Sequence, residues 1–144
     1  MTVYQPVRSA TLLIPSGPAH DLDRNHLFII LTDSVADLLN GQKESNLLTS
    51  VSTLNPALPH DKTCILHKGD HPFISHDSYV SYRDSRILET AKIIKGVETG
   101  VLIQKPLMDS GIVDKICDGL SDSPHSPEKI KRFFRMYLKQ LSGT

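Results

Sequence analysis

Histidine is the residue type whose number and spacing in this sequence point most directly to chemistry. The 144-residue chain contains seven histidines, and His67, His71 and His76 fall within ten positions. Because imidazole changes its charge near neutral pH, such a cluster could supply a general acid or a general base. The full set is His20, His26, His60, His67, His71, His76 and His125.

The same cluster could instead hold a divalent cation, since neutral imidazoles and neighbouring carboxylates are suitable ligands. Its spacing follows no familiar ligand pattern, and Gly69 and Pro72 disfavour a helix that would bring His67 and His71 onto one face. A metal-dependent enzyme is therefore the less favoured alternative. We expect no metal and no other cofactor.

Other catalytic and cofactor-binding patterns are missing from the sequence. It has no GxSxG nucleophile elbow, and Cys64 and Cys117 stand alone in apolar stretches where free, buried thiols are common. The stretch from Gly96 to Gly100 does not have the spacing of a phosphate-binding loop, so we expect these two glycines to be turn residues.

Composition indicates one folded domain, residues 1–144, in the cytoplasm. Sixteen basic residues balance sixteen acidic ones, which excludes the strong positive field of a general nucleic-acid binder. The apolar run Leu27–Leu31 is far shorter than the roughly 20 residues of a bilayer span, so no membrane contact is expected. Basic residues concentrate near the C-terminus, at Lys129, Lys131, Arg132, Arg135 and Lys139.

The elements that must position these side chains change character near residue 105, with β-like patterns in 1–105 and helical ones in 106–144. For Asp33–Asn40 we expect one or two helical turns. Short apolar or alternating runs bounded by turn residues predict strands at Val7–Pro15, His26–Thr32, Leu47–Leu54, Lys62–His67 and Ser78–Leu88.

Two helices are predicted in the C-terminal part. Ser110–Leu120 has apolar residues at helical spacing, and a second helix starts at Ser126-Pro127-Glu128, where a capping residue, a proline and an acid suit a helix N-terminus. The second helix is amphipathic, and its Lys131, Arg135 and Lys139 share one face by i, i+4 spacing.

Three segments, taken in order, resemble the MazF/PemK (Kid, CcdB-like) toxins. Asp23-Arg24-Asn25-His26 leads into an apolar strand, 48–53 is a strand rich in Ser and Thr, and Ser78-Tyr79-Val80 is followed by an Asp and an Arg. The resemblance covers residues 7–90. It implies an α+β protein built as a small SH3-like β-barrel with C-terminal helices. It also implies metal-independent cleavage of single-stranded RNA, an antitoxin protein as partner, and a homodimer.

Metal-free RNA cleavage requires a base for the 2′-hydroxyl proton, an acid for the 5′-oxygen and a cation for the phosphate. Arg24 or Arg83 would bind the phosphate, because a guanidinium offers several donors to phosphate oxygens. His26 or His76 would transfer the protons. Thr49 or Ser50 would be a polar aid to catalysis.

A second set of residues is predicted to bind RNA. The members are polar or charged and lie in the strands or on the last helix: Ser50, Asp84, Arg86, Lys131, Arg135 and Lys139. The alternative function is a non-catalytic SH3-like binding module, in which the same barrel presents a groove to a protein or nucleic acid.

Overall fold

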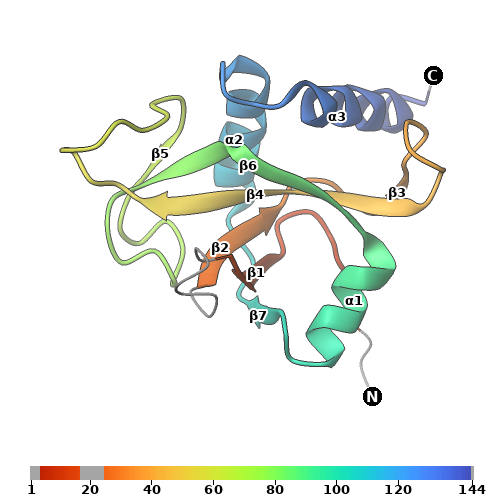
Figure 1. Ribbon diagram of the computed structural model, residues 1–144, viewed down its shortest axis with the longest axis horizontal. Helices are drawn as coiled ribbons and strands as arrows, with labels where there is room; N and C mark the ends of the chain where they lie inside the picture. Colours follow the sequence, from red (N-terminus) through yellow and green to blue (C-terminus); the bar gives the residue numbers. More distant parts are fainter. Residues whose placement is uncertain (1–3, 17–24, 144) are drawn as a thin grey trace.

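The computed structural model describes residues 4–16 and 25–143. Across these residues a seven-stranded sheet has the order β5-β6-β4-β2-β1-β7, with β3 paired to β4 outside this path. All its pairings are antiparallel, and the sheet curls into an open half-barrel with α1, α2 and α3 packed around it (Figure 1). The α+β class expected from the sequence is confirmed.

The strands are β1 (Thr11–Pro15), β2 (Asn25–Ile30), β3 (Val35–Ala36), β4 (Glu44–Thr53), β5 (Ile65–Leu66), β6 (Ser78–Glu89) and β7 (Ile103–Lys105). The helices are α1 (Thr90–Glu98), α2 (Ser110–Asp122) and α3 (Glu128–Leu141). Among these described helices, none has the length and apolar character required to cross a bilayer.

The sheet buries apolar side chains on both of its faces. Side chains along a strand point alternately to opposite faces, so Leu27 and Ile29 of β2 join the larger core with α2 and α3. Phe28 and Ile30 point the other way and join a smaller core that includes Ile93 of α1. Burial on both faces explains why β2 reads as a continuous apolar run rather than an alternating one.

The pairing of β4 with β6 is interrupted by a bulge. Ser50 is opposite Ser81, but Leu48 is opposite Arg86, so residues 82–85 leave the regular register. Within this stretch Tyr82 is fully buried, whereas Arg83 and Asp84 are exposed. The bulge therefore presents two charged side chains to solvent in the middle of a long strand, as bulges near functional surfaces often do.

Helix α1 was not predicted from the sequence. Gly96 lies inside this helix rather than in a turn. The position holds glycine because a Cβ would lie 2.6 Å from Cγ of Leu102, where the chain returns toward the sheet. Gly100 does occupy a turn, with φ of +79°. The sequence pattern did not indicate a helix here because close packing against Leu102 requires glycine, a residue with poor helix propensity, inside the helix.

The helical turns expected in Asp33–Asn40 are wrong. Val35–Ala36 forms β3, and the chain then turns back toward β4 through Gly41 and Gln42, both with positive φ. The backbone carbonyl oxygen of Asp37 accepts hydrogen bonds from the amides of Asn40 and Gln42. Pairing with β4 thus decides the conformation of a segment whose local pattern is ambiguous.

Both predicted C-terminal helices are confirmed, with small changes at their ends. The carboxylate of Asp109 caps α2 by accepting the amide of Ile112. Pro127 is the N-cap residue of α3, and Ser126 instead donates its hydroxyl to the carbonyl oxygen of Leu120, which closes the turn between the helices. The predicted strand Lys62–His67 is reduced to Ile65–Leu66.

Candidate functional site

A cleft of about 440 Å³ opens at the edge of the sheet where β2 begins, β4 ends and β6 begins. Its lining includes His26 from β2, Ser52 and Thr53 from β4, Tyr79 from β6, and His76 from the loop before β6. We call it the histidine cleft. Antiparallel pairing brings these strand ends to the same side of the molecule, as Figure 1 shows.

The two histidines of the cleft differ in their surroundings. His26 is half-buried, and its Nδ1 lies 2.6 Å from the hydroxyl oxygen of Ser16, which restrains the orientation of the ring. His76 is exposed, and its backbone carbonyl oxygen accepts the hydroxyl of Ser78. The cleft therefore combines one restrained imidazole with one that is open to solvent.

A smaller pocket of about 190 Å³ is lined by Tyr79, His60, Asp61, Arg83 and His125, among others. We call it the Asp61 pocket. The ring of His60 packs at 5.4 Å from the ring of Tyr79, with an interplanar angle of 40°. Tyr79 lines both cavities, so the Asp61 pocket is a direct neighbour of the histidine cleft.

Asp61 accepts hydrogen bonds from two separate segments of the chain. Its carboxylate accepts the Ser123 hydroxyl at 2.6 Å and the Thr63 amide at 2.9 Å. Burial by itself would raise the pKa of Asp61, but these hydrogen bonds outweigh burial and lower the pKa, with a smaller contribution from His125. The carboxylate stays ionised beside two histidines and an arginine.

Sequence reasoning did not select His60, Asp61 or His125. Their sequence separation carries no motif, and the hydrogen bond between Ser123 and Asp61 is what joins the loop before β5 to the turn between α2 and α3. A search for charged residues beside Gly- or Pro-rich turns would have marked them only as loop residues.

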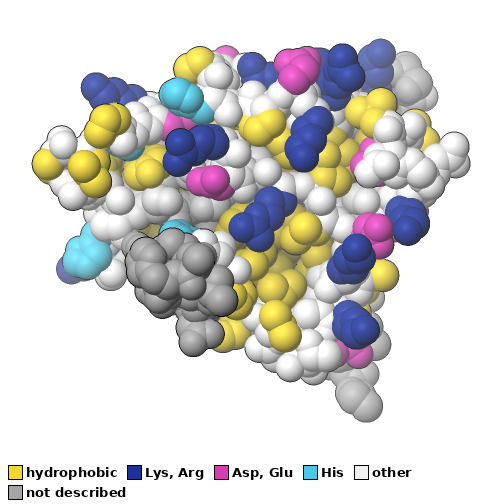
Figure 2. Space-filling view, viewed as in Figure 1, with side chains coloured by type: hydrophobic (Ala, Val, Ile, Leu, Met, Phe, Trp, Pro, Cys, Tyr) yellow, Lys and Arg dark blue, Asp and Glu magenta, His cyan; other side chains and the backbone are white. Residues whose placement is uncertain are grey.

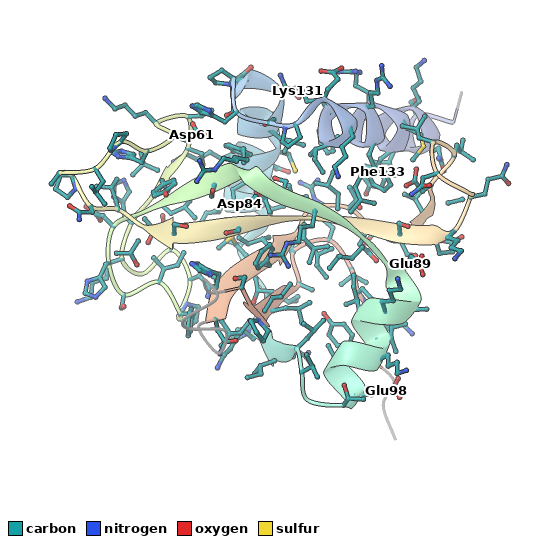
Figure 3. The ribbon with its side chains drawn as sticks, in the orientation of Figure 1. Asp61, Asp84, Glu89, Glu98, Lys131 and Phe133 are labelled. Atoms are coloured by element: carbon teal, nitrogen blue, oxygen red, sulfur yellow. The ribbon has the colours of Figure 1, made fainter. Side chains whose placement is uncertain are left out.

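Arg86 lies over the ring of Phe28, with 4.7 Å between the guanidinium carbon and the ring centroid. Such a contact stabilises a cation by about 0.5–2 kcal/mol and leaves its N–H groups available to an anion. Asp84 accepts the hydroxyl of Ser81 at 2.6 Å and, within the described part of the chain, forms no ion pair with Arg86. Figure 3 labels Asp84 beside β6, near the middle of the strand.

Several predicted site residues lie away from the histidine cleft. Thr49 is fully buried, with its hydroxyl 2.9 Å from that of Ser85, and Arg83 lines the Asp61 pocket instead. Ser50, also buried, pairs with Ser81 in the ladder between β4 and β6. Arg24 lies outside the described residues.

The basic residues of the last helix that were predicted to bind RNA are part of α3, and no residue of α3 lines the histidine cleft. Arg135 forms an exposed ion pair with Glu128 at 3.2 Å, an interaction worth roughly 0–1 kcal/mol. In Figure 3, Lys131 lies at the upper edge of the molecule, while Phe133 of the same helix points toward the sheet. Lys139 is exposed in the last turn of the helix.

The cluster of His67, His71 and His76 does not converge. Nδ1 of buried His71 accepts the amide of Phe73, so its Nε2 carries the proton and donates to the carbonyl oxygen of Pro106 at 2.7 Å. His67 instead lies 3.3 Å from Asp77. Over the described residues, no group of three or more His, Cys, Asp or Glu side chains could hold a metal ion.

Cys64 and Cys117 are both free and buried, as their sequence contexts predict. Burial raises the pKa of the Cys117 thiol to about 11, although Arg8 beside it acts in the opposite direction. Burial also raises the pKa of Cys64. Neither thiol is therefore a thiolate near neutral pH, and neither is suited to nucleophilic attack.

No protein-family model and no curated protein matches this sequence.

Proposed function

We propose that this protein is a metal-independent endoribonuclease that cleaves single-stranded RNA in the histidine cleft. The observation that supports this proposal is the presence of His26 and His76, from distant parts of the sequence, in the lining of one cleft. Two imidazoles in one cleft can supply the base and the acid that metal-free phosphodiester transfer needs for proton movement.

In the proposed reaction the 2′-oxygen of a ribose attacks the adjacent phosphorus, and the bond from phosphorus to the 5′-oxygen breaks. His26 takes the 2′-hydroxyl proton, because its contact with Ser16 restrains the ring in one orientation. His76 gives a proton to the departing 5′-oxygen, which leaves as a hydroxyl. The products are a 2′,3′-cyclic phosphate and a 5′-hydroxyl end.

A cation near the cleft would offset the charge that builds on the phosphate oxygens. Arg86 is the best-placed described candidate, because it lies on Phe28, and Phe28 and His26 are two residues apart on one strand and share a face of the sheet. Tyr79, between the two cavities, offers a ring on which a base flanking the scissile bond can stack.

We further propose that the half-barrel is SH3-like and that the protein acts in the cytoplasm as a toxin paired with an antitoxin protein, as its resemblance to the MazF/PemK toxins implies. In that arrangement a homodimer would place two histidine clefts in one particle. Fold analogy alone does not define an activity, so the cleft chemistry carries the proposal. The competing function is a binding module that holds RNA or a protein without cleaving it.

The decisive experiment incubates the purified protein with end-labelled single-stranded RNA in the presence of EDTA. We expect cleavage with 2′,3′-cyclic phosphate ends, a rate that passes through a maximum with pH, and no cleavage of a 2′-deoxy substrate. His26→Ala and His76→Ala should each lower the rate by about 10²–10⁴-fold.

His67→Ala is the matched control, because His67 is an exposed histidine of the same loop that does not line the cleft. It should leave the rate unchanged. Intact RNA that still binds the protein would favour the binding module. Cleavage that persists in both cleft variants, or that EDTA abolishes, would contradict the proposal.

A further inference from the structure

A second cavity of about 440 Å³ lies between α1, α3, the end of β6 and the turn before β4. We call it the α1–α3 groove. Figure 3 shows two of its lining residues, with Phe133 below α3 and Glu89 at the junction of β6 and α1. Four basic side chains from three separate segments line it: Lys43, Lys92, Lys129 and Arg132.

The acidic residues of the groove neutralise these cations only in part. Glu89 is shared, with its Oε1 at 3.5 Å from Nζ of Lys43 and 3.9 Å from Nζ of Lys92. Asp37, the other acid in the lining, is buried and accepts the backbone amide of Leu39. The groove therefore holds four basic against two acidic side chains, an excess of positive charge in a protein with no net charge.

Lys129 and Arg132 contribute most to this excess. Within residues 4–16 and 25–143, neither side chain forms a hydrogen bond or an ion pair. They lie three positions apart on α3, so they occupy the same flank of the helix. Lys131 and Lys139 do not line the groove, although they belong to the same helix.

The groove and the histidine cleft lie at opposite ends of the same two strands. Ser52 of β4 lines the cleft and Ser45 of β4 lines the groove, a separation of seven residues or roughly 23 Å at about 3.3 Å per residue. Arg86, on Phe28, lies along β6 between the two. In Figure 2, Lys and Arg side chains are spread over the face of the molecule that is drawn, with acidic side chains among them.

We propose that the α1–α3 groove binds phosphates of the same RNA strand that is cleaved in the histidine cleft, and so anchors longer RNA. This inference rests on the proposed function, because it takes RNA as the ligand. Proteins that bind single-stranded nucleic acid combine a positively charged groove with aromatic stacking platforms, over sites of roughly 4–16 nucleotides. Tyr79 would supply one such platform, and the guanidinium plane of Arg86, which covers the buried ring of Phe28, would supply another.

An acidic peptide is the other polyanion that a basic groove could accept. RNA is favoured because Arg86 lies along β6 between the groove and a cleft with hydroxyl, imidazole and aromatic groups, which suit a chain of phosphates, riboses and bases. The groove lining has eight charged or polar residues and four apolar ones, which are Leu39, Ile87, Leu88 and Phe133.

The test measures binding of a fluorescent, uncleavable 2′-O-methyl RNA 12-mer at several salt concentrations. Lys129→Gln/Arg132→Gln should weaken binding about tenfold or more at low salt. It should also reduce the slope of log K against log salt by about 1.4, since each contact between a cation and a phosphate of single-stranded RNA contributes about 0.7. Binding of a 3-mer should not change.

Lys131→Gln/Lys139→Gln is the matched control, because it removes the same charge from the same helix outside the groove. Equal weakening of RNA binding by both double variants would contradict RNA binding in the groove. It would favour the face of α3 that carries Lys131, Arg135 and Lys139, which the sequence pattern predicts to bind RNA. A 12-mer that binds the groove variant like the original protein would also contradict RNA binding in the groove. So would a poly-glutamate peptide that binds more tightly than RNA and loses affinity in that variant.

The same variants separate this inference from the proposed function. If EDTA-treated protein leaves RNA intact while the groove variant still weakens 12-mer binding, the groove stands and the cleavage proposal fails. If RNA is cleaved through His26 and His76 while both double variants bind alike, the cleavage proposal stands and the groove fails.

Discussion

The hydroxyl of Tyr82 in β6 donates a 2.7 Å hydrogen bond to the carbonyl oxygen of Ile116 in α2 and lies directly against Gly119 of the same helix. A Cβ at Gly119 would lie 2.1 Å from the Tyr82 hydroxyl oxygen. Tyr82 is fully buried, and this burial raises the pKa of its hydroxyl. The contact fixes the bulged part of β6, which carries Arg83 and Asp84, against α2.

Gly119→Ala should therefore destabilise the protein by about 1–3 kcal/mol, the usual cost of overpacking a core. Alanine normally favours a helix over glycine by about 1 kcal/mol, so the expected sign is opposite to that of helix propensity. Urea unfolding followed by circular dichroism measures the difference. In a Tyr82→Phe background the cost should become smaller, because the closest clashing atom is gone. A stability gain from Gly119→Ala would contradict this account.

Buried His71 should act as a neutral structural residue. His71→Ala removes a hydrogen bond to Pro106 and leaves the Phe73 amide without its acceptor, for an expected loss of about 1–3 kcal/mol of unfolding free energy. Nitrogen NMR of the ring should show the proton on Nε2. A proton on Nδ1 would be inconsistent with the contacts described here.

The hydrogen bond from Ser123 to Asp61 should make part of the stability depend on pH. The folded-state pKa of Asp61 lies below its ordinary value of 3.8, so the contribution is complete above that value and is lost as pH falls through the folded pKa. Ser123→Ala should destabilise the protein by a constant amount near neutral pH and by less in acid. Urea unfolding across this pH range measures the difference in unfolding free energy between the original protein and Ser123→Ala. In an Asp61→Asn background this difference should not depend on pH. A difference in unfolding free energy that grows in acid would contradict this account.

The two cysteines should resist thiol reagents in the folded protein. Burial raises the pKa of Cys117 to about 11 and also raises that of Cys64, which keeps both thiols protonated near neutral pH. Titration with a chromogenic disulfide should show no fast-reacting thiol before unfolding and two after unfolding in denaturant. Fast reaction of the folded protein would show that a thiol is exposed or ionised.

Sequence patterns predicted the elements whose signals are local. The capping and periodicity of 126–141 and 110–120 defined α3 and α2 because helix ends and amphipathic stripes depend on neighbouring residues. Helix α1 was missed because Gly96 is required by contact with Leu102 and not by the helix itself. Asp33–Asn40 was misread because pairing with β4 overrides its local preference.

For the candidate site, too, some features follow from local sequence and others only from tertiary contacts. The sequence alone determined which chemistry is available: an excess of histidine, two unreactive cysteines, and basic residues gathered near the C-terminus. The tertiary structure decided that His26 and His76 share a cleft, that Thr49 is buried, and that Lys129 and Arg132 rather than Lys131 line a groove. The chemistry of a side chain follows from its residue type alone. The proximity of side chains that are distant in sequence depends on strand register and helix docking, which are fixed only when both cores are buried.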